Sequence, residues 1–412
     1  MKIGIFPFFS LMGEVKPALK LGRIFQGSGN EVIFFSHGGK YEKLIEDFPL
    51  IRVSPEFTSE EIGNILSFHR NEGTVSQPLL SSKKLEEMVE EEVKVFESEK
   101  IDKIISFFQF TTSISARVVK IPLFSVTAGT WTYPFLKKNL PWRSIFILRY
   151  FPSLLHPFNE ISKKFGLRKF RNLLELTSGD ITLITDSPEI LGITLQEMER
   201  FYPQVGTRYF YIGPLLSGEE EKPPSEIERI INSSPPRILC TMGSSTPLFY
   251  LKEAYQALLE TGYPSIMVTP EDKAPYFPTR DNIVTISSLS STLLERTDLL
   301  VIHGGRTTVY WTCWAGKPFL GVGMQLEQEL NLRVLEKKGM GIRLLKKSFL
   351  KRKIKQTIKN LLSSSLYKEK AESIREVFRR SLTLNKRIDV ALTTYPSLRS
   401  TTPQILNPNF DS

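Results

Sequence analysis

The sequence is poor in the residues that form disulfides or bind zinc. Two cysteines, Cys240 and Cys313, and four histidines occur among 412 residues, and they do not follow the spacing of a zinc site. Both cysteines lie in apolar stretches, where a reduced, packed thiol is expected. We therefore expect neither a disulfide scaffold nor a structural metal, and the scarcity of cysteine favours a cytoplasmic location.

Long apolar runs are also missing. No run of about eighteen apolar residues occurs, so we expect no transmembrane helix and a soluble chain. The apolar start, Ile3 to Phe9, is short, contains Pro7 and lacks a small-residue cleavage site, so it reads as a first strand and not as a signal peptide.

Two common nucleotide-binding motifs are absent. No GxGxxG opens a helix and no Walker A sequence occurs, which counts against a dehydrogenase or a P-loop nucleotidase. The net charge of +10 favours an anionic partner, such as a nucleotide diphosphate or an acidic membrane surface. We expect no nucleic-acid partner, because no helix-turn-helix or RNA-binding aromatic motif is present.

What is present is a globular composition, 41% hydrophobic and 24% charged, in a chain long enough for two domains. Apolar runs alternate with segments of helical spacing, which predicts an α/β fold with two parallel sheets covered on both faces. Between the two alternations lies a stretch with Gly213-Pro214, three consecutive glutamates and two Pro-Pro pairs. We expect an N-terminal domain over 1–210, a linker over 211–236, a C-terminal domain over 237–375, a helix returning to the N-terminal domain over 376–395, and a mobile tail over 396–412.

The most informative segment is His303-Gly304-Gly305-Arg306-Thr307-Thr308, between a strand ending at Ile302 and a helix. Glycines at such a junction let the backbone approach a ligand, and the amides that open the helix point at it. A diphosphate fits there, because the histidine and arginine can add hydrogen bonds and positive charge, and the threonines can add hydroxyls.

A second glycine turn, Gly243-Ser244, follows the first strand of the same domain. It should lie at the carboxyl edge of the sheet, where open α/β sheets bind ligands. Each of the two turns, taken alone, is equally well explained as a tight turn, with His303 as a capping residue.

With these motifs, the sequence resembles the UDP-glycosyltransferase superfamily of the GT-B fold, which includes bacterial macrolide, glycopeptide and sterol glycosyltransferases. The resemblance runs in register from His303 through Gly305, Thr308, Gly316, Pro318, Glu327-Gln328, Asn331 and Gly339-Met340-Gly341. It implies two Rossmann-like domains facing across a cleft. It also implies a nucleotide-sugar co-substrate, with UDP as the expected nucleotide and a hexose-type sugar, and no separate cofactor.

The resemblance assigns roles in donor binding. In that family the histidine and the loop after it hold the diphosphate, and an acidic-Gln pair, here Glu327-Gln328, hydrogen-bonds the sugar hydroxyls. An acid at this helix N-terminus is also stabilising without any ligand. Trp311 departs from the pattern, because the family normally has a glutamate there for the ribose hydroxyls. The departure leaves open another ribose contact, an unusual donor, a non-catalytic relative, or a sugar-nucleotide epimerase of the same architecture.

Glu14 is the candidate catalytic base. It follows the first strand and opens the first helix, so it should lie at the cleft rim, in a segment that resembles the one where the family carries its base. An inverting transfer needs one base to take the acceptor proton. We expect no metal, since the helix terminus, His303 and Arg306 can stabilise the leaving diphosphate. The alternative is a glutamate that only stabilises a helix N-terminus.

An aromatic and basic segment precedes the linker. Trp131 and Trp142 belong to it, and we expect them to contact the acceptor in an apolar pocket or at a membrane surface. The alternative is that this segment forms packed helices of the N-terminal domain. A lysine-rich run over 346–355 similarly predicts either a lipid-binding patch or a solvated helix face. Together the two segments favour an apolar small-molecule or lipid acceptor, with peripheral contact to the inner face of the membrane.

Overall fold

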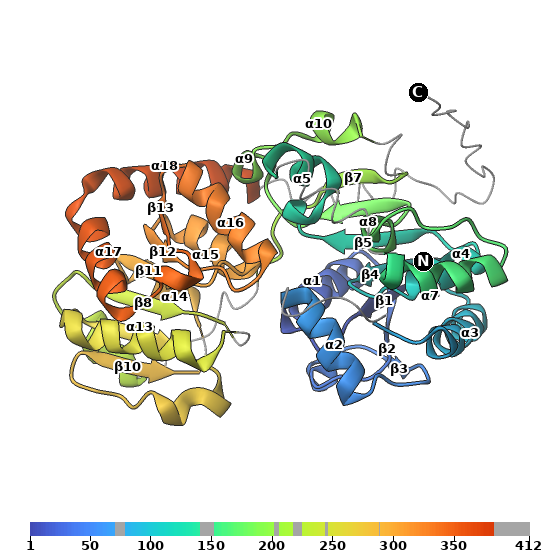
Figure 1. The fold of residues 1–412 in the computed structure, drawn as a ribbon, viewed down its shortest axis with the longest axis horizontal. Coiled ribbons are helices and arrows are strands. Elements are labelled where there is room, and N and C mark those ends of the chain that lie inside the picture. Colours follow the sequence, from blue (N-terminus) through green and yellow to red (C-terminus); the bar gives the residue numbers. More distant parts are fainter. Residues whose placement is uncertain are drawn as a thin grey trace.

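The computed structural model describes residues 1–70, 79–140, 152–201, 206–216, 225–243, 246–287 and 289–382. These residues form two α/β domains that lie side by side, each built on one sheet with helices on both faces (Figure 1). Every strand pair in both sheets is parallel, as the alternation in the sequence predicted.

The N-terminal domain has a seven-stranded sheet of order β3-β2-β1-β4-β5-β6-β7. Its strands are β1 (Lys2–Pro7), β2 (Glu31–Ser36), β3 (Leu50–Arg52), β4 (Lys103–Phe107), β5 (Leu123–Thr127), β6 (Ile181–Ile184) and β7 (Arg208–Tyr211). Helices cover both faces, so the inner strands are apolar on both sides. In β1, Ile5 packs in one cluster with helix α1, whereas Phe6 on the opposite face packs against Phe96 of α3.

The helices of this domain range from a single turn to the seventeen residues of α3. They are α1 (Met12–Gly27), η1 (Glu42–Leu44), α2 (Ser59–Arg70), α3 (Ser82–Ser98), α4 (Thr112–Val118), η2 (Gly129–Trp131), α5 (Tyr133–Asn139), α7 (Pro152–Lys164), α8 (Leu173–Leu176), α9 (Pro188–Leu191) and α10 (Leu195–Glu199). The aromatic segment before the linker divides, because Tyr133 and Phe135 are buried in the core while Trp131 is partly exposed.

The C-terminal domain has a six-stranded sheet of order β10-β9-β8-β11-β12-β13. Its strands are β8 (Ile238–Thr241), β9 (Ser265–Val268), β10 (Ile283–Ile286), β11 (Leu299–Ile302), β12 (Phe319–Gly321) and β13 (Gly341–Arg343). Its helices are α13 (Leu248–Thr261), η4 (Glu271–Tyr276), α14 (Ser291–Glu295), α15 (Arg306–Ala315), α16 (Leu326–Lys337), η5 (Lys346–Ser348), α17 (Lys351–Ser363) and α18 (Ser365–Leu382). Cys240 and Cys313 are free and buried.

Glycine residues lie at the C-terminal ends of helices in this domain. Gly316 ends α15 in a left-handed conformation with φ 64°, and Gly339, with φ 75°, follows α16. Both positions match the glycines that the sequence placed at helix C-termini, because only glycine adopts this conformation without strain. Helix α15 starts at Arg306, two residues before the expected start, since Gly305 serves as its N-cap.

The two domains are joined by the linker and by the last helix. The linker contains η3 (Ser225–Ile227) and α12 (Glu228–Ile231), and residues 217–224 lie outside the described part. Helix α18 runs through the boundary that we expected at 375/376, because no glycine or proline interrupts it there. It contacts α9 of the N-terminal domain, and Phe378 packs in one cluster with Ile190 (Figure 1). Residues 383–412 lie outside the described part, so most of the expected returning helix and the whole tail do too.

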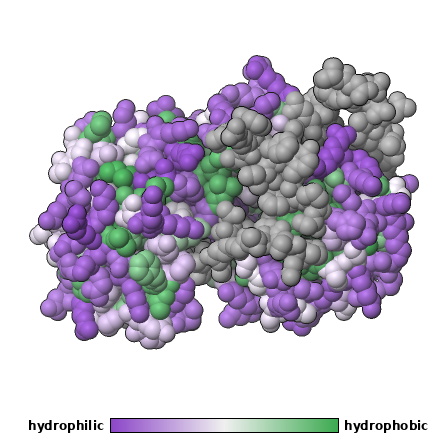
Figure 2. Space-filling model, in the orientation of Figure 1, coloured by the Kyte–Doolittle hydropathy of each residue, from purple (hydrophilic) through white to green (hydrophobic). Residues whose placement is uncertain are grey.

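The surface is polar over most of the face shown in Figure 2, and the hydrophobic residues on the C-terminal domain form small groups enclosed by hydrophilic ones. Within the described ranges, no helix is both long and apolar enough to cross a membrane.

Candidate functional site

Two charged side chains meet where the domains face each other. Glu14 lies in the first turn of α1, and Arg306 is the first residue of α15. The Oε1 atom of Glu14 lies 3.8 Å from Nη2 of Arg306, and the two side chains are only 16% and 13% exposed. Each helix begins just after the carboxyl end of a strand, β1 or β11, so the carboxyl edges of the two sheets face each other. The sequence predicted this arrangement for Glu14.

A cleft opens around this ion pair. Its polar wall is formed by Glu14, Arg306 and Glu327, which lies in the first turn of α16. Its apolar wall comes from the N-terminal domain, with Phe108, Trp131 and the end of β5. A polar group of a ligand can therefore reach both charges while an apolar part stays against the aromatic rings.

A second, apolar pocket adjoins the cleft, and Phe108 and Trp131 line both. The rest of its lining is almost entirely aliphatic and aromatic, including Phe110, Leu154 and Phe158. Trp131 was an expected acceptor contact, and the structure places it where the two pockets join. Trp142, the other expected contact, lies outside the described residues.

Burial tunes the charge of Glu14. It raises the pKa of this carboxyl from 4.5 to about 6; the charge of Glu327 adds to the rise and that of Arg306 opposes it. For Arg306, burial alone would lower the pKa, but the carboxylates of Glu14, Glu327 and Asp186 raise it more, so the guanidinium stays charged. The site thus holds a carboxylate that is ionised at neutral pH but is a stronger base than an exposed glutamate.

The imidazole of His303 lies between two glycines. A Cβ atom at Gly243 would come within 2.6 Å of its Nε2 atom, and one at Gly305 would come closer still. At Gly304, with φ 81°, a Cβ would meet the backbone oxygen of Gln328 at 2.5 Å. The sequence predicts that the glycines of these turns allow the close approach of a ligand. In the structure each of them also makes room for protein atoms.

His303 is neutral, which corrects a second expectation. Burial lowers its pKa to about 4, and a hydrogen bond to the backbone of Thr241 only partly offsets this. At pH 7 the ring therefore adds hydrogen bonding but no positive charge. Its Nδ1 atom is buried and has no hydrogen-bond partner among the described residues.

The start of α15 offers backbone donors. No side chain of the described residues caps this helix, and Gly305, Arg306 and Thr307 are partly exposed. The first amides of a helix have no intrahelical partner and carry the positive end of its dipole, so they can bind an anion. Thr308 is buried, and its carbonyl accepts a hydrogen bond from the hydroxyl of Thr312. Ser244, expected in the facing turn, lies outside the described residues.

The acidic-Gln pair separates into two environments. Glu327 lines the cleft, but Gln328 is buried, and its Oε1 atom accepts a hydrogen bond from the amide of Met324 at 2.9 Å. The oxygen of Gln328 is thus engaged in fixing the loop before α16, which the sequence did not indicate. Trp311 packs in the core against Trp314, with ring centroids 5.2 Å apart, and is 3% exposed. It takes no part in lining the cleft.

Sequence reasoning missed a buried polar contact between the domains. Asp186 follows β6, and its oxygens accept hydrogen bonds from the amide of Gly129 at 2.5 Å and the hydroxyl of Tyr310 at 2.6 Å. The same hydroxyl accepts from the amide of Ser187, and burial raises the pKa of Asp186. Because Tyr310 belongs to α15, this contact holds α15 against the N-terminal domain. The sequence feature that could have indicated this contact is a run of polar residues directly after a strand.

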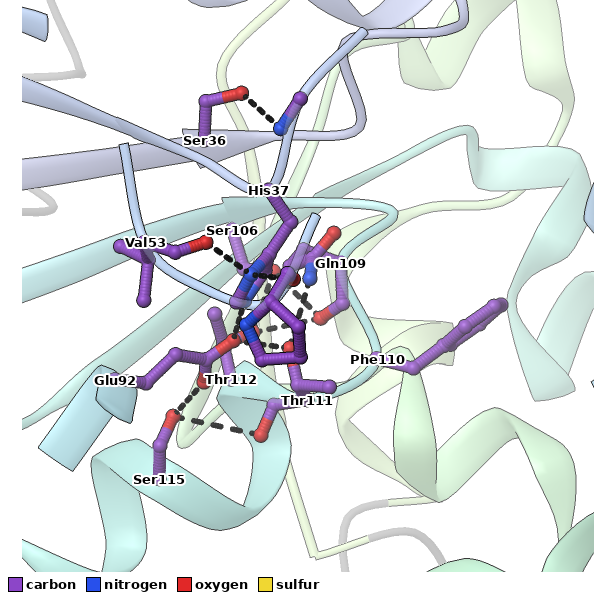
Figure 3. A network of polar contacts seen from close by, with 12 residues as sticks. Ser36, His37, Val53, Glu92, Ser106, Gln109, Phe110, Thr111, Thr112 and Ser115 are labelled. Atoms are coloured by element: carbon purple, nitrogen blue, oxygen red, sulfur yellow. Dashed lines mark hydrogen bonds and ion pairs between the residues drawn. The ribbon is translucent and has the colours of Figure 1, made fainter. Parts of the chain in front are cut away.

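A second buried network supports the apolar wall. Glu92 accepts from the hydroxyls of Thr111 and Ser115, and its Oε1 lies 2.8 Å from Nε2 of His37 (Figure 3). Gln109 donates to Thr111, which ties the network to the loop after β4. Phe108 in this loop has φ 55°, a conformation that side chains rarely adopt. The network therefore fixes a strained loop that carries an aromatic ring into the cleft.

No cluster of three metal-ligating side chains occurs within the described part of the chain. Of the histidines that the sequence left unassigned, His37 belongs to this buried network, and the exposed His156 lies 3.3 Å from Glu160. Neither lines the cleft.

Comparison with known proteins points to one activity. Residues 247–384 match the family model described as the glycosyltransferase family 28 C-terminal domain. The chain is 24% identical over 315 residues to the PGL/p-HBAD biosynthesis rhamnosyltransferase of Mycobacterium bovis, covering 72% of this chain and 68% of the relative. It is 23% identical over 295 residues to a PGL/p-HBAD biosynthesis glycosyltransferase of Mycobacterium tuberculosis, covering 67% of each chain.

Solved structures agree in fold over nearly the whole chain. The glycotransferase of kitacinnamycin superposes with a TM-score of 0.70 at 13% identity, covering 96% of this chain and 99% of that one. The calicheamicin glycosyltransferase CalG4 superposes with a TM-score of 0.67 at 14% identity, with the same coverage. In its matched C-terminal region, its sequence relatives and its two facing parallel-sheet domains, the chain is similar to glycosyltransferases of the GT-B fold.

Proposed function

We propose that the chain is an inverting, metal-independent glycosyltransferase. It moves a hexose-type sugar from a UDP-sugar to a hydroxyl of an apolar, lipid-like acceptor. The observation that carries this proposal is the ion pair between Glu14 and Arg306 across the cleft, beside the uncapped start of α15. It joins a buried carboxylate from one domain to an anion site from the other.

The donor end of the proposal rests on the start of α15. A diphosphate over the amides of Gly305 and Thr307 would be held by the helix terminus and the guanidinium of Arg306. Glu327 also lines the cleft and would accept hydrogen bonds from sugar hydroxyls.

The transfer step then balances within these groups. Glu14 takes the proton of the acceptor hydroxyl, and the acceptor oxygen forms a bond to the anomeric carbon on the side opposite the diphosphate. The bond from that carbon to the diphosphate oxygen breaks, and its electron pair leaves with the diphosphate. The α15 amides and Arg306 stabilise the charge that develops on the leaving group. No cofactor or metal takes part.

The ion pair also couples the two ends of the site. In the empty cleft, Arg306 lowers the pKa of Glu14. A bound diphosphate brings negative charge to Arg306 and weakens this effect, so donor binding makes Glu14 a stronger base. The carboxylate would thereby be a still stronger base when a donor is present.

The acceptor end of the proposal rests on the apolar pocket shared by Phe108 and Trp131. Its lining offers hardly any polar contact, so it suits the aglycone of an apolar acceptor whose hydroxyl reaches Glu14. The relatives named for PGL/p-HBAD biosynthesis and the rhamnosyltransferase among them favour a hexose-type sugar.

The test is a panel of nucleotide sugars incubated with a lipid extract in the presence of EDTA, with products identified by mass spectrometry. We expect a glycosylated product from wild type and none from Glu14→Gln, which should still bind the donor by calorimetry. Arg306→Gln should weaken donor binding by about tenfold to a hundredfold, the usual contribution of hydrogen bonds to a charged group.

The matched control is Glu60→Gln, which removes an exposed glutamate from the first turn of α2, far along the chain from the cleft. It should keep full activity. Normal turnover by Glu14→Gln would remove this residue from the mechanism. Conversion of the nucleotide sugar without an acceptor would indicate an epimerase, and tight donor binding without any product would indicate a non-catalytic relative.

A further inference from the structure

Exposed hydrophobic side chains gather at one place on the C-terminal domain. Seven large hydrophobic residues of the described part are exposed, and three of them are Phe249 at 54%, Leu345 at 49% and Leu350 at 46%. Phe249 opens α13, whereas Leu345 and Leu350 flank η5 just before α17. Single exposed hydrophobic residues are ordinary, so their grouping is the informative feature.

Contacts between the starts of α13 and α17 bring together the two segments that carry these side chains. The ring of Phe249 lies 5.2 Å from that of Tyr250, which lies 6.2 Å from that of Phe349. The amide of Lys351 donates to Oε2 of Glu253 at 2.5 Å. The starts of α13 and α17 are therefore fastened together.

A buried aromatic ring anchors the turn between β13 and α17. Phe349 is fully buried in the core between the sheet and these helices, while Leu345 and Leu350 on either side of it point outward. A buried aromatic ring thus holds two leucines in the solvent on a rigid support. Phe349 covers the core at this turn, so the exposed side chains of Leu345 and Leu350 are not needed for that purpose.

Basic residues surround these hydrophobic side chains. Lys346, Lys347 and Arg352 are exposed and have no ion-pair partner within the described ranges. The nearby Lys351 and Lys355 are instead held by Glu260, at 2.6 and 2.7 Å. Cations without an ion-pair partner therefore stand next to the exposed leucines in the sequence.

We infer that Phe249, Leu345, Leu350, Lys346, Lys347 and Arg352 form a docking surface for an anionic lipid bilayer. Apolar side chains inserted at the headgroup level, with lysines and arginines against anionic lipid, are the combination that binds such a surface. Charge complementarity selects the bilayer, because a patch with unpaired cations attracts acidic lipid but repels a second copy of a chain that carries a net charge of +10.

The position of the surface suits the proposed function, on which this part of the inference rests. Phe249 follows β8 and Leu345 follows β13, so both lie at the carboxyl edge of the sheet, as does the loop from His303 to Thr308. A bilayer held at this edge lies on the cleft side of the domain, where a lipid-like acceptor would be presented.

The experiment is co-sedimentation of the full chain with vesicles of phosphatidylcholine, with and without phosphatidylglycerol, at low and high salt. It needs no sugar donor, so its result is independent of whether transfer occurs. We expect binding to the anionic vesicles only, lost at high salt. Lys346→Glu with Lys347→Glu should reduce the partition coefficient by at least about fivefold for each lysine, and Leu345→Ser with Leu350→Ser should reduce it as well.

The matched control is Leu366→Ser with Lys368→Glu. Leu366 is 57% exposed in the first turn of α18 and Lys368 is exposed beside it, but both lie beyond the far end of α17. This variant should bind as wild type does. Equal binding by wild type and the Lys346/Lys347 variant, or by neutral and anionic vesicles, would overturn the inference. So would a dimer in analytical ultracentrifugation that the Leu345/Leu350 variant converts to monomer, since a second copy would then occupy the surface.

Discussion

Glu14→Gln should abolish transfer and at the same time stabilise the folded chain. The wild-type carboxylate is buried, and its charge is unfavourable in the folded state even with Arg306 beside it, because the net effect of its surroundings raises its pKa. Glutamine has nearly the same shape as a protonated glutamate but cannot ionise. The substitution therefore removes an unfavourable charge while leaving the packing of the first turn of α1 intact.

The magnitude follows from the pKa values. A rise from 4.5 to about 6 is a difference of about 1.5, which corresponds to about 2 kcal/mol at a pH above both values. The folded state binds more protons than the unfolded state between these two pKa values, so wild type gains stability as pH falls through this window. The advantage of the Gln variant should therefore be about 2 kcal/mol at pH 8, below about 1 kcal/mol at pH 5, and close to zero only well below pH 4.5.

Urea denaturation of both proteins at pH 8 and pH 5 measures this difference. Glu60→Gln is again the control, and it should change the free energy of unfolding by a few tenths of a kcal/mol at either pH. A destabilised Glu14→Gln would refute the reasoning, because a carboxylate that only stabilises a helix N-terminus contributes about 0.3–1 kcal/mol when charged. A stabilisation that is equal at both pH values would refute it too.

Three further outcomes are expected. His303→Ala should weaken donor binding in calorimetry by about tenfold or less, since the neutral imidazole brings no charge to the site and acts only by packing between the turns at Gly243 and Gly305, and it should leave the free energy of unfolding of the N-terminal domain unchanged. Glu92→Gln should destabilise that domain by about 3–5 kcal/mol in urea, because it breaks a buried pair with His37, and donor affinity should persist in the folded variant. Tyr310→Phe should cost about 1–3 kcal/mol by leaving Asp186 one hydrogen bond short, and a change within measurement error would show that the interdomain contact is not formed in solution.

The architecture could be predicted from the sequence because local patterns decide it. The strands Ile283–Ile286 and Leu299–Ile302 and the helix Leu248–Thr261 occur with the predicted bounds. An apolar run of strand length or an apolar pattern of helical spacing shows which side of a segment is buried against its neighbours. Glycines such as Gly316 mark where a helix ends. The position 375/376, where we expect the C-terminal domain to end, lies within the single helix α18.

The sequence also indicated some of the residues that form the cleft, because it placed them directly after strands. Glu14 and Arg306 each open a helix at the carboxyl end of a strand, and this placement follows from parallel-sheet topology. The side-chain environments did not follow. The neutral His303, the engaged oxygen of Gln328 and the buried Trp311 depend on which atoms surround each side chain in the folded core.

The sequence by itself determined two parallel-sheet domains and the segments that line the space between them. Only the tertiary structure decided that Glu14 and Arg306 pair, that Asp186 and Tyr310 join the domains, and that a glutamate has a pKa of about 6. The physical reason is that secondary structure and side-chain environment depend on contacts over different separations along the chain. Secondary structure follows from neighbours along the chain, whereas burial and charge interaction depend on distances of a few ångströms between residues that are far apart in the sequence.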